Sequence, residues 1–144
     1  MAIFTKSYCK SILESKSSYS FHGITLDCSD ARNPEKIISF ANKNYQEIER
    51  QAAESIWKDI DNDYDYYGNK PQKAALDSFF KKYPKYRDII SILQLKKGFI
   101  DENDCISLYF NIKDDPTSSK RMLNFYIEFN HSGNMRITDI DFDR

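Results

Sequence analysis

The residues best suited to chemistry in this chain form an acidic run from Asp59 to Gly68, which reads Asp-Ile-Asp-Asn-Asp-Tyr-Asp-Tyr-Tyr-Gly. Four aspartates alternate with other residues, and three tyrosines lie among and after them. The whole chain has a formal net charge of −1, so this run is a local concentration of negative charge. Such a run could bind a metal ion, bind a basic protein surface, or form a solvated helix end.

The metal hypothesis can be tested against the calcium loop of EF-hands. Asp61, Asp63 and Asp65 have the spacing that opens such a loop, which also needs Gly at its sixth position and Glu at its twelfth. Those positions hold Tyr66 and Gln72, and counting from the preceding aspartate fails in the same way. The sequence therefore predicts no metal ion and no other cofactor. A metal-dependent adaptor protein that uses this aspartate run stays open as a third function, beside the two described below.

The apolar residues around the acidic run predict a helix. They recur three or four positions apart and form one stripe: Tyr45, Ile48, Ala52, Ile56, Ile60, Tyr64 and Tyr67. Asp61 and Asp65 fall on the opposite side and are expected to face solvent. Asp63 would turn toward the stripe, so the helix either frays near Asn62 or gives Asp63 a partner. Gly68 is a suitable stop.

A second acidic set closes the chain, where Asp139, Asp141 and Asp143 would share one face of the last strand. Charge on a terminal strand protects a sheet edge from pairing with other chains, and the same charge could instead contact a partner. Tyrosine suits an interface because it buries a large area and keeps a polar tip. The expected partner-binding residues are Glu54, Asp61, Asp65, Tyr66, Asp139 and Asp141.

Nucleophilic catalysis finds little support in the remaining residues. His22 and His131 are the two histidines; we expect His22 in a strand and His131 in a turn. Cys28 could meet His22 only through the accident of folding, and Cys105 is expected to be a small buried hydrophobe. We therefore predict no catalytic residues and no enzymatic activity.

The elements that must position these residues predict an α+β fold. An N-terminal extended segment is followed by two to three helices in the middle of the chain. Asn33 is the expected cap of the first helix, and Pro71 opens a later one. Strict alternation around Phe110 and Phe125 predicts a C-terminal antiparallel β-meander with helices packed on one face. A change of phase in the last strand predicts a bulge near Thr138.

Length and composition place further limits on the chain. Its 144 residues suit a single domain, expected to span 1–144. The near-neutral charge argues against nucleic acid as a partner, and no apolar run is long enough for a membrane span. Three cysteines without metal-type spacing suggest reduced thiols in a cytosolic protein, and the N-terminus lacks a signal-peptide layout.

The order of these parts resembles the small α+β immunity proteins of bacterial toxin–immunity systems, including contact-dependent inhibition and polymorphic toxins. The resemblance lies in the long helix with a Tyr/Asp-rich end, the apolar step Ile92–Leu95 that leads into a three-stranded meander, and the closing Asp139-Ile-Asp141. It covers most of the chain and includes no diagnostic motif. It implies a cytoplasmic, non-enzymatic protein that binds and neutralises one cognate toxin domain, for example a nuclease.

A different class of function remains as the alternative. A small ligand-binding or enzymatic α+β domain would hold a pocket between its sheet and its helices. Tyr109, Tyr126 and His131 could line the mouth of such a pocket. A deep pocket with convergent polar groups would favour this alternative, whereas a filled core and an acidic, aromatic surface would favour the inhibitor.

Overall fold

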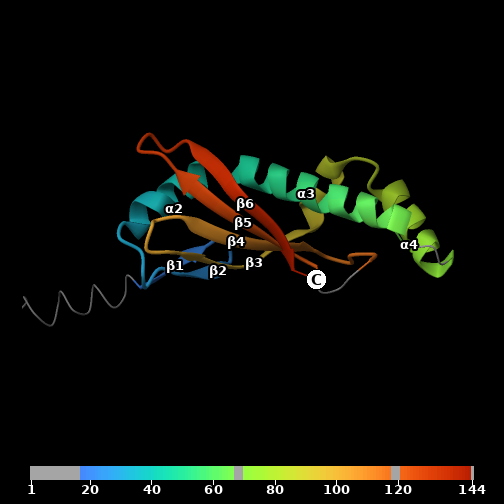
Figure 1. The fold of residues 1–144 in the computed structure, drawn as a ribbon, viewed down its shortest axis with the longest axis horizontal. Helices are drawn as coiled ribbons and strands as arrows, with labels where there is room; N and C mark the ends of the chain where they lie inside the picture. The colour runs from blue at the N-terminus through green and yellow to red at the C-terminus, as the bar shows by residue number, and fades with distance from the viewer. Residues whose placement is uncertain (1–16, 67–69, 118–120, 144) are drawn as a thin grey trace, which may run out of the picture.

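The protein has an α+β fold in which helices cover one face of a six-stranded, mostly antiparallel sheet (Figure 1). This computed structural model describes the backbone of residues 17–66, 70–117 and 121–143, and their side chains except those of 63–66, 70–72 and 143. The predicted fold class is therefore confirmed. Residues 1–16, for which the sequence favours a short helix, lie outside the described residues.

The N-terminal extended segment is a hairpin rather than one strand. It comprises β1 (Ser18–Phe21) and β2 (Ile24–Asp27), joined by His22 and Gly23, both at positive φ. His22 thus lies in a tight turn, and its prediction as a strand residue was wrong because Gly23 supplies the turn. β2 pairs in parallel with β3 (Leu93–Ile100). Gly98 permits this close approach, since a Cβ there would lie 2.8 Å from Leu26 Cδ2.

The C-terminal strands follow the predicted alternation. They are β4 (Ile106–Ile112), β5 (Met122–Phe129) and β6 (Met135–Asp143), arranged as an antiparallel meander. The register shifts where Tyr126 pairs with Asp139 and Ile127 pairs with Ile137, leaving Thr138 unpaired. This irregularity confirms the predicted bulge, which returns the apolar residues on both sides of it to the same face.

The helices begin where the sequence indicates. They are α2 (Pro34–Lys43), α3 (Tyr45–Tyr66), α4 (Lys70–Lys82) and the short 3₁₀ helix η2 (Tyr86–Ile92). Helix α3 runs unbroken past Asn62, so the predicted fraying there does not occur, and the side chain of Asp63 lies outside the described part. The apolar residues that follow Pro84 are divided between η2 and the start of β3.

The start of α2 is held by a residue far away in sequence. Asn33 makes no side-chain capping bond. Instead, Asp104 Oδ1 accepts the backbone N–H groups of Arg32 and Asn33 at 2.8 and 3.0 Å. Asp104 lies in the β3–β4 turn at a φ of 57°. The carboxylate thus fixes α2 against the sheet and satisfies donors that a helix start leaves unpaired.

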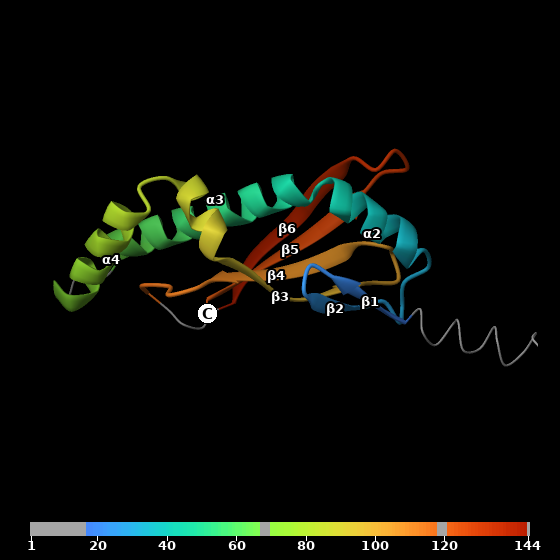
Figure 2. The same cartoon turned by 180° about the vertical axis from the view of Figure 1, so that it is seen from behind.

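The core lies between the helices and one sheet face. Fully buried side chains include Ile56 and Ile60 of α3 and Phe110 and Phe125 of the strands. Figure 2 shows α2 and α3 along the same face, with α4 beyond the end of the strands. We call the other face, which carries Tyr109 and the odd-numbered aspartates of β6, the open face. No described helix covers it.

Candidate functional site

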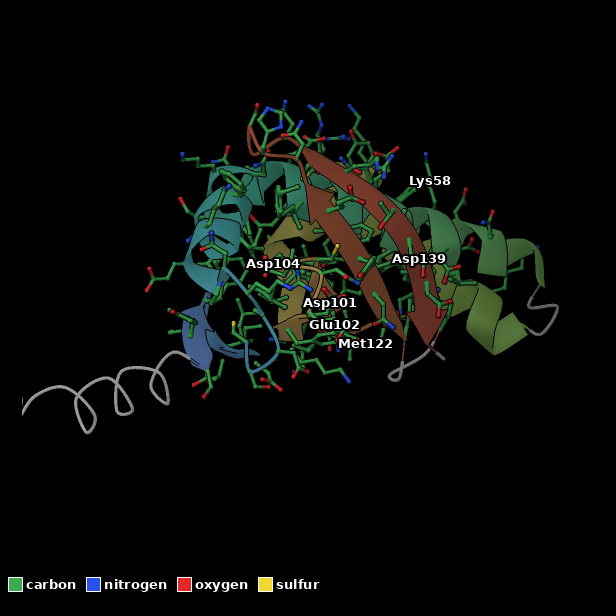
Figure 3. The ribbon with its side chains drawn as sticks, turned by 60° about the vertical axis from the view of Figure 1, so that its left-hand side comes forward. Lys58, Asp101, Glu102, Asp104, Met122 and Asp139 are labelled. Atoms are coloured by element: carbon green, nitrogen blue, oxygen red, sulfur yellow. The ribbon has the colours of Figure 1, made fainter. Side chains whose placement is uncertain are left out.

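The predicted contact residues fall on two separate surfaces. Asp61 is exposed on α3, on the helical side of the sheet. Asp139 and Asp141 pair with Tyr126 and Asn124 and are exposed on the open face, shown for Asp139 in Figure 3. The structure therefore does not bring the two acidic sets together. Asp65 and Tyr66 belong to the last turn of α3, but their side chains lie outside the described residues.

Glu54 is engaged in an ion-pair network along α3. Its carboxylate contacts Arg50 Nη1 at 3.0 Å and Lys58 Nζ at 2.8 Å. The hydrogen bond from Lys58 is the main reason that the pKa of Glu54 is lowered. Arg50 also binds Glu47, at 2.6 Å. Glu54 therefore contributes little uncompensated negative charge to the surface.

Asp59, the first aspartate of the acidic run, is a structural residue. Its carboxylate pairs with Arg121 Nη1, while Arg121 Nε donates to Asp115 Oδ2 at 2.8 Å. Nη2 of the same guanidinium donates to Thr117. The Arg121 side chain is only 1% exposed. Sequence reasoning missed this cluster because Asp59 lies 62 positions from Arg121 in the chain and charge alone does not indicate burial.

An acidic, aromatic hollow lies between α3 and α4. Trp57, Asp61, Asp77 and Phe80 line this space of about 320 Å³, which we call the Trp57 hollow. The rings of Trp57 and Phe80 meet edge to face with centroids 5.2 Å apart. Asp61 follows Trp57 by one helical turn, and Asp77 precedes Phe80 by one turn. Because the helices run in opposite directions, both carboxylates lie on the same side of the ring pair.

Three of these four residues were not predicted as site residues. Trp57 is partly buried and packs against the edge of the core. Its Nε1 donates to the carbonyl of Tyr83 at 3.0 Å, which fixes the indole plane. In the sequence, each helix has an aromatic residue and an aspartate about one helical turn apart. These two pairs can be recognised as one site only when the packing of α3 against α4 is known.

A second hollow, of about 420 Å³, also borders Trp57 and carries positive charge. Lys85, Tyr86 and Arg87 line it together with Trp57 and Pro84. Hydrogen bonds from Arg87 and Arg50 lower the pKa of Tyr86. Trp57 thus lines both an acidic hollow and a basic one.

The open face is polar and aromatic. Phe99 is 37% exposed there, and Lys97 Nζ lies 4.4 Å from the ring centroid of Tyr109. Asn111 Oδ1 and Asn124 Oδ1 are buried beneath neighbouring side chains and have no hydrogen-bond partner among the described residues. This face is a second candidate surface, but its aspartates also fit the protection of an edge strand.

The pocket predicted for the alternative function is not formed by its expected residues. Tyr109 and Tyr126 lie on the open face, away from the helices, because their β4 and β5 neighbours Leu108 and Phe125 fill the core. Tyr126 donates at 2.5 Å to Oδ2 of Asp101, a residue of the β3–β4 turn that is labelled in Figure 3, and this bond raises the pKa of Tyr126. His131 lines a separate small hollow of about 180 Å³.

The described thiols and His22 have structural surroundings. Burial raises the pKa of Cys28 to about 11 and also raises that of Cys105, so both thiols are protonated at neutral pH. His22 stacks on Tyr45 with ring centroids 3.6 Å apart, and its Nε2 lies 2.7 Å from Asn42 Oδ1. These contacts anchor the β1–β2 turn to the helical layer.

Two searches of the described residues concern other classes of site. No three His, Cys, Asp or Glu side chains gather there as ligands for a metal ion. Within the same residues, no helix has both the length and the apolar character required to cross a bilayer.

Comparison with known proteins gives no relative on which to base an assignment. No protein-family model matches the chain, and neither does any curated protein or solved structure. The candidate site therefore rests on its own geometry, in which the Trp57 hollow combines two carboxylates with two aromatic rings.

Proposed function

We propose that this protein is an immunity protein that binds a cognate bacterial toxin domain in the cytoplasm and neutralises it. The observation that carries the proposal is the Trp57 hollow, where two carboxylates flank exposed aromatic surface outside a filled core. Interfaces of high affinity concentrate their binding energy in such aromatic anchors, and surrounding charge selects the partner. The layout of the chain, which resembles small α+β immunity proteins, agrees with this function.

The mechanism follows from charge and shape. A toxin that acts on nucleic acid presents a basic cleft to its substrate. Asp61 and its acidic neighbours on α3 would occupy part of that cleft, and Trp57 would supply apolar contact. Binding would exclude the substrate without any chemical step by the inhibitor.

The proposal predicts that a toxin domain is encoded beside the gene of this protein, and the test uses that domain. Bacteria that express this domain should stop growing, and co-expression of the full chain should restore growth. A copurified complex of the two proteins should account for the rescue. If the full chain is produced in soluble form and neither restores growth nor binds the toxin domain, the proposal is wrong.

A further inference from the structure

We infer that the Trp57 hollow is a receptor for the side chain of a lysine or arginine presented by a protein partner. The inference rests on the proposed function, because it names the chemical group of the toxin that this surface would bind. Its evidence is the arrangement of two acids and two rings on neighbouring helices.

The ring pair provides a floor for an alkyl stem and for a cation. Trp57 and Phe80 are both only partly buried and line the hollow with their rings in edge-to-face contact. The carbon chain of lysine or arginine packs well on such a surface. A cation near the face of tryptophan is attracted by the ring quadrupole, most strongly for the indole. The chain itself uses this interaction elsewhere, where Lys97 lies over Tyr109.

The two carboxylates provide the walls. Asp61 and Asp77 are both exposed and both line the same hollow, one from each helix. Asp77 also makes other interactions within the chain, so an incoming cation would add to them or compete with them. A guanidinium between two carboxylates can donate to both, and such charge-assisted bonds are among the strongest in proteins.

The basic hollow limits where a cation can bind beside Trp57. Lys85 and Arg87 line that hollow and would repel a cation placed in it. A basic side chain of the partner is therefore directed to the hollow that Asp61 and Asp77 line. Hollows of opposite charge at one tryptophan also fit the near-neutral charge of the whole chain.

Trp57 is the single tryptophan of the chain, so its fluorescence reports on ligands that bind beside its indole. The probe is a tetra-arginine peptide, and its matched neutral control is tetra-citrulline. We expect saturable change of Trp57 emission with tetra-arginine, weakened by added salt, and no comparable change with tetra-citrulline. The Asp61→Asn/Asp77→Asn variant should bind tetra-arginine about tenfold more weakly.

Control variants separate this site from general electrostatic attraction. Asp139→Asn/Asp141→Asn removes the same charge from the open face and should leave the affinity for tetra-arginine unchanged. Circular dichroism should confirm that both double variants are folded. The inference is overturned by tetra-citrulline binding equally well, by the Asp61→Asn/Asp77→Asn variant retaining full affinity, or by both double variants weakening binding equally.

The growth assay distinguishes failure here from failure of the proposed function. The Asp61→Asn/Asp77→Asn variant can lose affinity for tetra-arginine and still protect the bacteria. In that case the hollow binds basic side chains but takes no part in toxin binding. Protection by a chain that never binds tetra-arginine would overturn the receptor and leave the immunity function standing.

Discussion

Arg121 is the residue through which the outer end of α3 is joined to the start of β5. Its guanidinium contacts Asp59, Asp115 and Thr117 in a site where the arginine side chain is 1% exposed. The sequence could not predict this cluster, because Asp59 looks like its exposed neighbours and its partner follows 62 positions later. The indication in the sequence that Asp59 differs from its neighbours was helical phase, which places it on a different side of α3 from Asp61.

Replacement of Arg121 should be costly. Arg121→Met leaves Asp115 buried without its cationic partner, and we expect the free energy of unfolding to fall by about 3–5 kcal/mol. Urea denaturation measures this loss. The matched control is Arg136→Met, which breaks an exposed pair with Glu128 and should cost less than about 1 kcal/mol. Equal losses for the two variants would show that the buried cluster does not stabilise the fold.

Glu47 makes the free energy of unfolding depend on pH. Hydrogen bonds from Arg50 and Gln51 lower the pKa of Glu47 from 4.5 to about 2. A carboxylate whose pKa is lowered by folding stabilises the folded state at pH values above its unfolded-state pKa. This stabilisation is lost as the pH falls toward its folded-state pKa. The free energy of unfolding should therefore decrease from about pH 4.5 toward pH 2, and Glu47→Gln should reduce this slope modestly. An unchanged slope in the variant would mean that other carboxylates cause it.

At the scale of elements, the sequence predicts best where the hydrophobic pattern is local. The alternation in β4 and β5 and the stripe of α3 specify their own buried faces. The alternation is confirmed, and so is the stripe at Ile48, Ala52, Ile56 and Ile60; the side chains of Tyr64 and Tyr67 lie outside the described residues. The β1–β2 hairpin was missed because its turn residue His22 looks like part of a strand. The parallel pairing of β2 with β3 joins segments about 70 residues apart, which no local pattern indicates.

Gly98 tests that pairing directly. A methyl group at this position would lie 2.8 Å from Leu26 Cδ2 and 2.9 Å from the carbonyl oxygen of Ser107. Gly98→Ala should therefore lower the free energy of unfolding by about 1–3 kcal/mol and increase hydrogen exchange in β2. Thr25→Ala, an exposed change on β2, is the control. Wild-type stability and exchange in Gly98→Ala would contradict the close approach.

The aspartates of β6 belong to the same scale. Asp139 and Asp141 lie on the last strand of the sheet, whose outer edge has no partner among the described residues, and Ile140 between them is 48% exposed. We expect Asp139→Asn/Asp141→Asn to increase self-association, because charge is what discourages pairing at an edge. Sedimentation velocity measures this change. A monodisperse variant that no longer binds the toxin would instead place these residues in the interface.

At the scale of the whole molecule, the sheet lies between two acidic surfaces. The sequence predicted that residues of both surfaces would form one set of partner contacts. Helical phase and strand alternation tell which residues are exposed, but not which exposed residues lie together. That information comes from the packing of α3 and α4 on the sheet, and it selects Asp61 with Trp57 rather than with Asp139. The candidate site is thus only partly predictable: Asp61 was found, and Asp77 and the two aromatic rings were not.

The central claim is that the α3 side of the molecule binds a toxin domain. Isothermal titration calorimetry of the full chain against the toxin domain encoded beside its gene tests it most directly. Asp61→Lys/Asp65→Lys should weaken the affinity by at least about a hundredfold, since close charge pairs across interfaces contribute several kcal/mol. Asp139→Lys/Asp141→Lys should keep the affinity of the wild type. Unchanged affinity for a folded Asp61→Lys/Asp65→Lys protein would contradict the account.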